Sequence, residues 1–223
     1  MSDVLLADQA NRHKDHLSVR HAAESDAAMT NVLAIIPARS GSKGIADKNF
    51  RRLGGALSPV DYAIRAAEYA NIHTIIVSTD TPERVLPGRL SQGTLTILRR
   101  PPELAQDETL MIDVVKHVLA EIPGPPDQII VLLQPTQPLR KPAYVLQAIA
   151  LLTRSEADSV VTVVQLPPTH VPDRVCFLSL NGRLFHWDDV NAQWLSDQPS
   201  RRQDCALGYV RDGTCYVFSR QTV

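Results

Sequence analysis

Short apolar runs alternate with segments of helical spacing from residue 31 onward. The apolar runs predict strands at residues 32–36, 73–77, 94–98, 128–133 and 159–164. Helices are predicted between them, one after Ser58 and Pro59, one capped by Thr109 and one that begins at Pro142. This alternation is typical of a mostly parallel sheet with helices on both faces. We therefore predict an α/β fold, with residues 128–133 at the centre of the sheet.

The inward faces of two of these helices follow from the period of 3.6 residues. The helix after Thr109 has its apolar residues at Met111, Val114, Val115, Val118 and Ile122. The helix after Pro142 is predicted to bury Val145, Leu146, Ile149 and Leu152.

The pattern changes after residue 166. Residues 177–180 and 183–187 flank Asn181-Gly182, which predicts a β-hairpin with a type I′ turn. An isolated hairpin is marginally stable in water, so its apolar side chains need a surface to cover. Residues 214–219 predict a returning strand. We expect residues 1–30 to be a flexible extension and residues 31–223 to form one domain.

The segment from Ala38 to Asn49 carries the strongest functional signal. It follows the first strand and contains Arg39, Ser40, Gly41, Ser42, Lys43, Gly44 and Lys48. Glycine lets the backbone approach a ligand closely, and successive N–H groups in such turns form an anion site. The segment has neither Walker A nor G-x-G-x-x-G spacing. A phosphate-binding loop at the carboxyl end of a strand is the favoured interpretation, and a flexible basic surface loop is the alternative.

Other polar residues follow later strands. Gln134, Thr136 and Arg140 come after the run 128–133, where they indicate either a ligand site or a rigid strand-to-helix connection. Asp80 follows the second strand and is interpreted either as a polar contact at the same edge or as a helix N-cap. On spacing alone, residues 99–107 and 201–204 are interpreted as solvated charged segments and residues 209–216 as a turn into a strand.

Composition excludes several classes of function. The chain has 223 residues, a formal net charge of -1 and a pI of about 6.6, which gives no electrostatic case for nucleic-acid binding. No apolar run approaches the ~20 residues that span a bilayer, so no membrane partner is expected. The three cysteines lack metal-ligand spacing and predict reduced thiols in a cytoplasmic protein.

Seven segments in a fixed order carry a resemblance to a known family. They are IIPARSGSKGIADKN, VSTD, RPPELAQD, LLQPTQPLR, ADSVVTV, RRQD and YVRDGTCYVF. Together they resemble the acylneuraminate cytidylyltransferases, which include the CMP-sialic acid synthetases. The resemblance implies a Rossmann-like nucleotidyltransferase that joins CTP to a nine-carbon sugar acid (a nonulosonic acid) and releases pyrophosphate. It also implies Mg²⁺ as cofactor and a homodimer in which residues 167–200 form a dimerisation excursion.

The resemblance also assigns roles to residues of this chain. The expected catalytic cations are Arg39, Lys43 and Lys48. The expected nucleotide contacts are Ala38, Ser40, Gly41, Ser42, Gly44, Asn49, Asp80 and Arg100. The expected sugar contacts are Gln134, Thr136, Arg140, Gln203 and Tyr216. The metal ligands are not assigned, because the family carries them in an Asp-rich segment after the Tyr216 strand, whereas this chain ends at Val223.

Three alternatives stay open beside this hypothesis. The enzyme could act on another sugar acid, of the legionaminic or pseudaminic type, or use GTP. It could also be a nucleotide-binding scaffold that is catalytically impaired because the Asp-rich segment is absent. A phosphate-binding kinase is disfavoured by the missing Walker A spacing.

Overall fold

The computed structural model describes residues 4–8, 31–41, 44–55, 57–85, 93–167, 170, 176–178, 184–186 and 208–223. The chain divides into two compact units. The first comprises Met1–Ala7, His13–Thr162 and Gly213–Val223, and the second comprises Asp8–Arg12 and Val163–Asp212.

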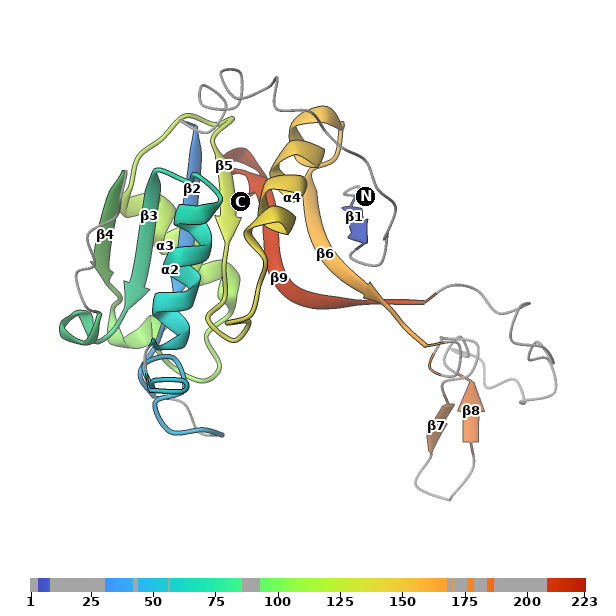
Figure 1. Ribbon diagram of the computed structural model, residues 1–223, viewed down its shortest axis with the longest axis horizontal. Helices are drawn as coiled ribbons and strands as arrows, with labels where there is room; N and C mark the ends of the chain where they lie inside the picture. The colour runs from blue at the N-terminus through green and yellow to red at the C-terminus, as the bar shows by residue number, and fades with distance from the viewer. Residues whose placement is uncertain are drawn as a thin grey trace. The chain divides into compact units, whose positions relative to one another are not determined.

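A seven-stranded sheet in the order β1-β6-β9-β5-β2-β3-β4 organises the fold (Figure 1). Its strands are β1 (Val4–Asp8), β2 (Val32–Pro37), β3 (Thr74–Thr79), β4 (Thr94–Arg99), β5 (Ile129–Leu132), β6 (Ser159–Gln165) and β9 (Tyr209–Ser219). The helices are α2 (Pro59–Tyr69), α3 (Met111–Glu121) and α4 (Pro142–Arg154). Short 3-10 turns occupy Pro82–Arg84, Pro102–Leu104 and Arg220–Thr222.

Strand β5 lies at the centre of the sheet, as predicted, but the sheet there is mixed. Strands β2, β3, β4 and β5 run parallel, with Ala34 opposite Val131 in the β2–β5 register. On its other side β5 pairs antiparallel with β9, where Leu132 lies opposite Tyr216. The mostly parallel α/β fold is therefore confirmed, with β9 as an antiparallel neighbour of β5.

Alternate residues of β2 enter two separate cores. Ala34 and Ile36 belong to a cluster with residues of α2 and α4, whereas Leu33 and Ile35 belong to a second cluster with residues of α3. Successive side chains of a strand point to opposite faces, so this division places helices on both faces of the sheet. Figure 1 shows α2 and α4 on one face and α3 on the other.

The predicted helix starts are partly confirmed. Ser58 caps α2 in a reciprocal capping box with Asp61, because the Ser58 backbone N–H donates to that carboxylate at 2.8 Å. Thr109 does not cap α3, whose N-cap is Leu110, and instead donates its hydroxyl to the Glu103 carbonyl at 3.3 Å. The prediction for Leu146 was also wrong, since it is 38% exposed while Ala148 is buried.

The later strands differ from their predicted bounds. The returning strand begins at Tyr209, so the turn predicted in residues 209–216 is absent; Gly213 reaches φ 73° inside the strand. In the second unit, β7 (Cys176–Leu178) and β8 (Leu184–His186) pair antiparallel, which confirms the hairpin pairing. The predicted turn at residues 181–182 and most of 167–200 lie outside the described residues. Of residues 1–30, the structure describes only β1.

None of the helices in the described part of the chain combines the length and apolar character needed to cross a bilayer.

Candidate functional site

The order of the parallel strands defines where a ligand site is expected. From β2 the chain proceeds to β3 and β4 on one side, and then returns to place β5 on the other side of β2. The carboxyl ends of β2 and β5 therefore flank a topological switch point, where open α/β sheets bind their ligands. Both loops that the sequence singled out, residues 38–49 and residues 133–141, leave the sheet at this point.

A cleft of about 600 Å³ lies at this edge of the sheet. It is formed by the segments after β2, β3 and β4, and its lining residues are Ser40, Gly41, Asp80, Arg99, Arg100, Pro101, Pro102, Ala105 and Gln106. A second cleft of about 530 Å³ shares Ser40, Gly41, Ala105 and Gln106 with the first. It adds Arg39, Ala46, Asp47 and Asp107. The structure thus brings together predicted nucleotide contacts from three separate segments.

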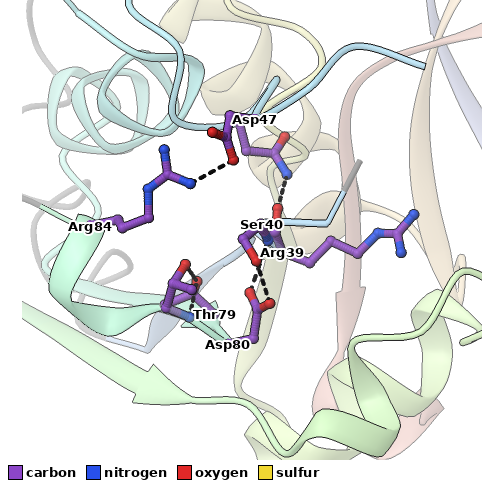
Figure 2. A network of polar contacts seen from close by, with 8 residues as sticks. Arg39, Ser40, Asp47, Thr79, Asp80 and Arg84 are labelled. Atoms are coloured by element: carbon purple, nitrogen blue, oxygen red, sulfur yellow. Dashed lines mark hydrogen bonds and ion pairs between the residues drawn. The ribbon is translucent and has the colours of Figure 1, made fainter. Parts of the chain in front are cut away.

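Asp80 fixes the start of the β2 loop. Its carboxylate accepts hydrogen bonds from the Ser40 backbone N–H at 2.9 Å and from the Ser40 hydroxyl at 2.6 Å (Figure 2). Asp80 is not a helix N-cap, because Thr81 holds that position in the following 3-10 turn. Since both Ser40 donors are engaged by Asp80, this pair holds the loop against the end of β3.

Arg39 spans the gap between the β2 loop and the segment after β4. Its Nη2 forms an ion pair with Asp107 Oδ1 at 2.5 Å, and its Nη1 donates to the Ala105 carbonyl at 3.3 Å. Each side chain of the ion pair is 26% exposed. A guanidinium has five N–H donors, so these two bonds hold Arg39 in place at the wall of the second cleft and leave donors for an anion.

Arg100 is the buried cation of the larger cleft. It is 4% exposed, and it donates from Nε to the Ser78 hydroxyl at 3.1 Å and from Nη2 to the Ser78 carbonyl at 2.8 Å. Burial lowers the pKa of Arg100 to about 10, with a further lowering by Arg39 and an opposing effect of Asp80. Arg100 therefore remains a cation at neutral pH, held rigidly at the end of β3.

Asn49, at the end of the β2 loop, is hydrogen-bonded to the start of the same loop. Its side chain is buried, and Nδ2 donates to the Arg39 carbonyl at 2.9 Å. The Asn49 carbonyl in turn accepts from the Val60 N–H of α2 at 3.1 Å. On the same turn, Lys48 and Gly44 are exposed. Ala38 is buried, and its N–H donates to the Ser78 carbonyl at 2.9 Å.

Two residues of this loop, Ser42 and Lys43, lie outside the described residues. Their predicted roles stay predictions, as does that of Gln203, which also lies outside them.

The predicted sugar contacts after β5 line neither of these two clefts. Arg140 is 8% exposed, and it donates from Nε to the Thr214 carbonyl at 2.9 Å and from Nη2 to the Gln134 carbonyl. It therefore ties this loop to β9. Thr136 is exposed, and Tyr216 packs half-buried against the cluster that contains residues of α3.

The segment after β4 was not recognised from spacing alone. Residues 99–107 were interpreted as a solvated charged turn, yet Pro101, Pro102, Ala105 and Gln106 line the larger cleft, and Asp107 holds Arg39. The missed signal was position, because this segment also follows the carboxyl end of a predicted parallel strand.

The carboxylates beside the two clefts are engaged by protein groups. Asp80 accepts from Ser40, Asp107 pairs with Arg39, and Asp47 pairs with Arg84 at 2.6 Å. Within the described ranges, no three His, Cys, Asp or Glu side chains come together as a metal site.

The fold and the strand-end clefts define an α/β protein with candidate ligand clefts at the carboxyl ends of its parallel strands, and comparison with known proteins specifies the family. Residues 33–177 match the family model described as cytidylyltransferase, and the chain belongs to that family. The N-acylneuraminate cytidylyltransferase of Streptococcus agalactiae serotype III (strain NEM316) is 32% identical over 193 residues, which cover 85% of this chain and 44% of that protein. This chain therefore spans less than half the length of that relative.

Two further proteins are similar over shorter or more divergent regions. The CMP-N,N'-diacetyllegionaminic acid synthase of Legionella pneumophila subsp. pneumophila is 32% identical over 143 residues, which cover 62% of this chain and 60% of that protein. The solved structure of CMP:2-keto-3-deoxy-manno-octonic acid synthetase complexed with CTP has a TM-score of 0.58 at 17% identity, and the match covers 86% of this chain and 75% of that one. This structural likeness supports the fold.

Proposed function

We propose that the protein transfers CMP from CTP to a sialic-acid-like nonulosonic acid and releases pyrophosphate. The observation that carries the proposal is the larger cleft at the carboxyl ends of β2, β3 and β4, where Ser40, Asp80 and Arg100 come together in a member of the cytidylyltransferase family. The name of the Streptococcus agalactiae relative supports the choice of CTP and of a nonulosonic acid.

In the proposed reaction, the anomeric hydroxyl of the sugar acid attacks the α-phosphorus of CTP. A new oxygen–phosphorus bond forms, and the bond to the β-phosphate oxygen breaks to release pyrophosphate. The hydroxyl proton passes to water or to a phosphate oxygen. We assign Arg39, Lys43 and Lys48 to neutralise the triphosphate and the departing pyrophosphate, because preorganised cations lower the barrier to such a transfer.

Arg39 and Arg100 are suited to different tasks in this scheme. Arg39 is held at the wall of the second cleft by Asp107, where its remaining donors can meet phosphate oxygens. Arg100 is buried and fixed on Ser78, which suits it to recognise the nucleoside in a rigid geometry. Asn49 is assigned to the nucleoside as well, and its side chain orders the loop by binding the Arg39 carbonyl.

Mg²⁺ fits this site as an ion that arrives on the triphosphate. Mg²⁺ takes oxygen ligands, commonly one or two carboxylates together with substrate phosphates. Asp80 lies on the wall of the larger cleft, and its oxygens, which each accept one hydrogen bond from Ser40, have further lone pairs that would hold the ion beside the phosphates. The ion supplies charge neutralisation when it is bound.

For the sugar acid, we assign Gln134, Thr136, Arg140, Gln203 and Tyr216. The similarity to the Legionella pneumophila synthase favours one specific alternative acceptor, a legionaminic-type acid. We further propose a homodimer, in which residues 167–200 are the dimerisation excursion, and a cytoplasmic location.

The test is a pyrophosphate-release assay with each of the four nucleoside triphosphates, Mg²⁺ and a panel of nonulosonic acids. Release that requires CTP and a sialic-acid-like acid supports the proposal, and release with a legionaminic-type acid alone selects the alternative. Arg39→Ala serves as the negative control. Release with GTP alone, or CTP binding in calorimetry without any release, contradicts it.

A further inference from the structure

Arg84 contacts both ends of the turn formed by residues 47–50, at the end of the proposed phosphate-binding loop. Its Nη1 donates to Asp47 Oδ1 at 2.6 Å, and its guanidinium carbon lies 4.8 Å from the centroid of the Phe50 ring. Lys48 and Asn49, both assigned to the nucleotide, lie between these two residues in the sequence. Figure 2 shows the bond between Asp47 and Arg84 beside the contacts of Ser40 with Asp80.

Asp47 gives this turn an uncommon backbone conformation. Asp47 has φ 55°, in the left-handed region, which glycine adopts freely, asparagine and aspartate occasionally, and other residues rarely. Its carbonyl accepts from the N–H groups of Phe50 at 2.9 Å and Arg51 at 2.8 Å, so the whole turn is organised around this one residue. Such a conformation persists when the surrounding contacts determine it, and the Asp47 side chain is bound by Arg84.

Arg84 itself belongs to a different part of the fold. It ends the 3-10 turn Pro82–Arg84, shortly after β3, and it lines neither of the two clefts described above. Its two contacts therefore tie the β2 turn to the end of β3 from outside the site. The ion pair with Asp47 is partly exposed, and such a pair alone contributes little to stability. Arg84 instead holds one short turn through two contacts at once, the ion pair with Asp47 and a cation–π contact with Phe50.

The same turn is connected to the cation that we assign to the phosphates. Asn49 Nδ2 donates to the Arg39 carbonyl at 2.9 Å, so a shift of the turn also moves the point at which the Arg39 backbone is held.

We propose that Arg84 is a positioning residue for nucleotide binding. By holding Asp47 and Phe50, it fixes the turn that presents Lys48 to the triphosphate and Asn49 to the nucleoside. The inference rests on the proposed function, since it concerns the same nucleotide site. It adds a residue from outside that site, with no contact of its own to the nucleotide.

The kinetic test uses Arg84→Gln, Asp47→Asn and the double variant. Asparagine tolerates a left-handed backbone, so Asp47→Asn removes the charge with little change in backbone preference. We expect the KM for CTP, measured with Mg²⁺ present, to rise about 5- to 10-fold in each single variant, because binding residues are misplaced. We expect kcat to stay within about twofold and the double variant to be no worse than the worse single one, because both remove one interaction.

Two further variants separate positioning from general damage. Arg84→Lys keeps a cation for Asp47 but loses the planar guanidinium, so we expect it to recover part of the lost affinity. Arg65→Gln removes the same charge from an exposed position of α2 and should leave the KM for CTP unchanged. Thermal denaturation of all variants checks that each one folds.

A measurement without substrate tests the inference independently. Hydrogen exchange of the Phe50 and Arg51 amides, which donate to the Asp47 carbonyl, should be faster in Arg84→Gln and unchanged in Arg65→Gln. If the wild-type protein neither binds nor uses CTP, the proposed function fails while this exchange difference can still be observed. Unchanged exchange, an unchanged KM for CTP in Arg84→Gln, or strictly additive effects in the double variant would overturn the positioning role.

Discussion

The two loops that leave the sheet at the switch point are held in different ways. Besides the Ser40 and Asn49 contacts described above, the β2 loop is held by side-chain pairs at the surface, Arg39 with Asp107 and Asp47 with Arg84, whose members are a quarter to a half exposed. The β5 loop is held from within by Arg140, which is 8% exposed and binds two backbone carbonyls. We expect the partly exposed pairs of the β2 loop to exchange partners more readily when an anion arrives than the buried contacts of the β5 loop. We infer that the nucleotide end adapts and that the β5 end serves as a rigid reference.

The largest expected effect is on catalysis at the adaptable loop. Arg39→Ala should lower kcat/KM with CTP by about 100- to 1000-fold, the range seen when one preorganised donor to a developing charge is removed. The free energy of unfolding should change by no more than about 1 kcal/mol, because the lost ion pair is partly exposed. Steady-state kinetics and urea denaturation measure the two quantities. Near-normal turnover would remove Arg39 from the proposed machinery.

For the β5 loop, we expect the main effect of a substitution to be on stability rather than on catalysis. Arg140→Ala removes the donors to the Gln134 and Thr214 carbonyls, so the free energy of unfolding should fall by about 2–4 kcal/mol. Urea denaturation measures this loss, with the exposed Arg154→Ala of α4 as the matched control. A loss no greater than that of the control would show that the two loops do not differ in rigidity.

Arg100 provides a further test of the difference between the two loops, because it is a buried residue within the nucleotide site. Replacement by methionine removes two hydrogen bonds to Ser78 and also the cost of burying a charge, so the unfolding free energy should change by less than about 1 kcal/mol. CTP affinity should nevertheless fall about tenfold, because a charge-assisted contact is lost. Calorimetric titration with CTP gives the affinity. Unaltered affinity would show that this cation serves the fold alone.

The smallest expected effect concerns pH. A hydrogen bond from Arg84 lowers the pKa of Asp47 below its ordinary value of 3.8. A carboxyl whose folded pKa is lowered contributes its stabilisation fully above the unfolded pKa, and loses it as pH falls through the folded value. Amide exchange rates at Phe50, corrected for intrinsic pH dependence, should therefore be constant from about pH 5 to pH 8. Loss of protection inside that range would indicate that another group controls the turn.

Much of the fold could be predicted because local patterns and tertiary structure agree. The run 32–36 forms β2, and Ser58 caps α2 as its sequence suggests. The wrong predictions concern features that are determined by tertiary contacts. Thr109 has the right chemistry for a cap, but its hydroxyl binds the Glu103 carbonyl instead. No local pattern shows that β9 pairs antiparallel with β5.

The candidate site, too, could be predicted only where its residues are contiguous in the sequence. The β2 loop is recognisable because its glycines and cations are contiguous in the sequence. The pairing of Arg39 with Asp107 and of Asp47 with Arg84 joins residues that are 68 and 37 positions apart, so neither pair has a local signature. The fold alone brings them together.

The position of β9 has a consequence for how the chain acquires its structure. This strand lies between β5 and β6, although both are synthesised before it. Until residues 209–219 emerge from the ribosome, two strand edges in the middle of the sheet lack a neighbour and can pair with other chains. Completion of the sheet therefore depends on a late, long-range pairing, and pairings of this kind form more slowly than local ones.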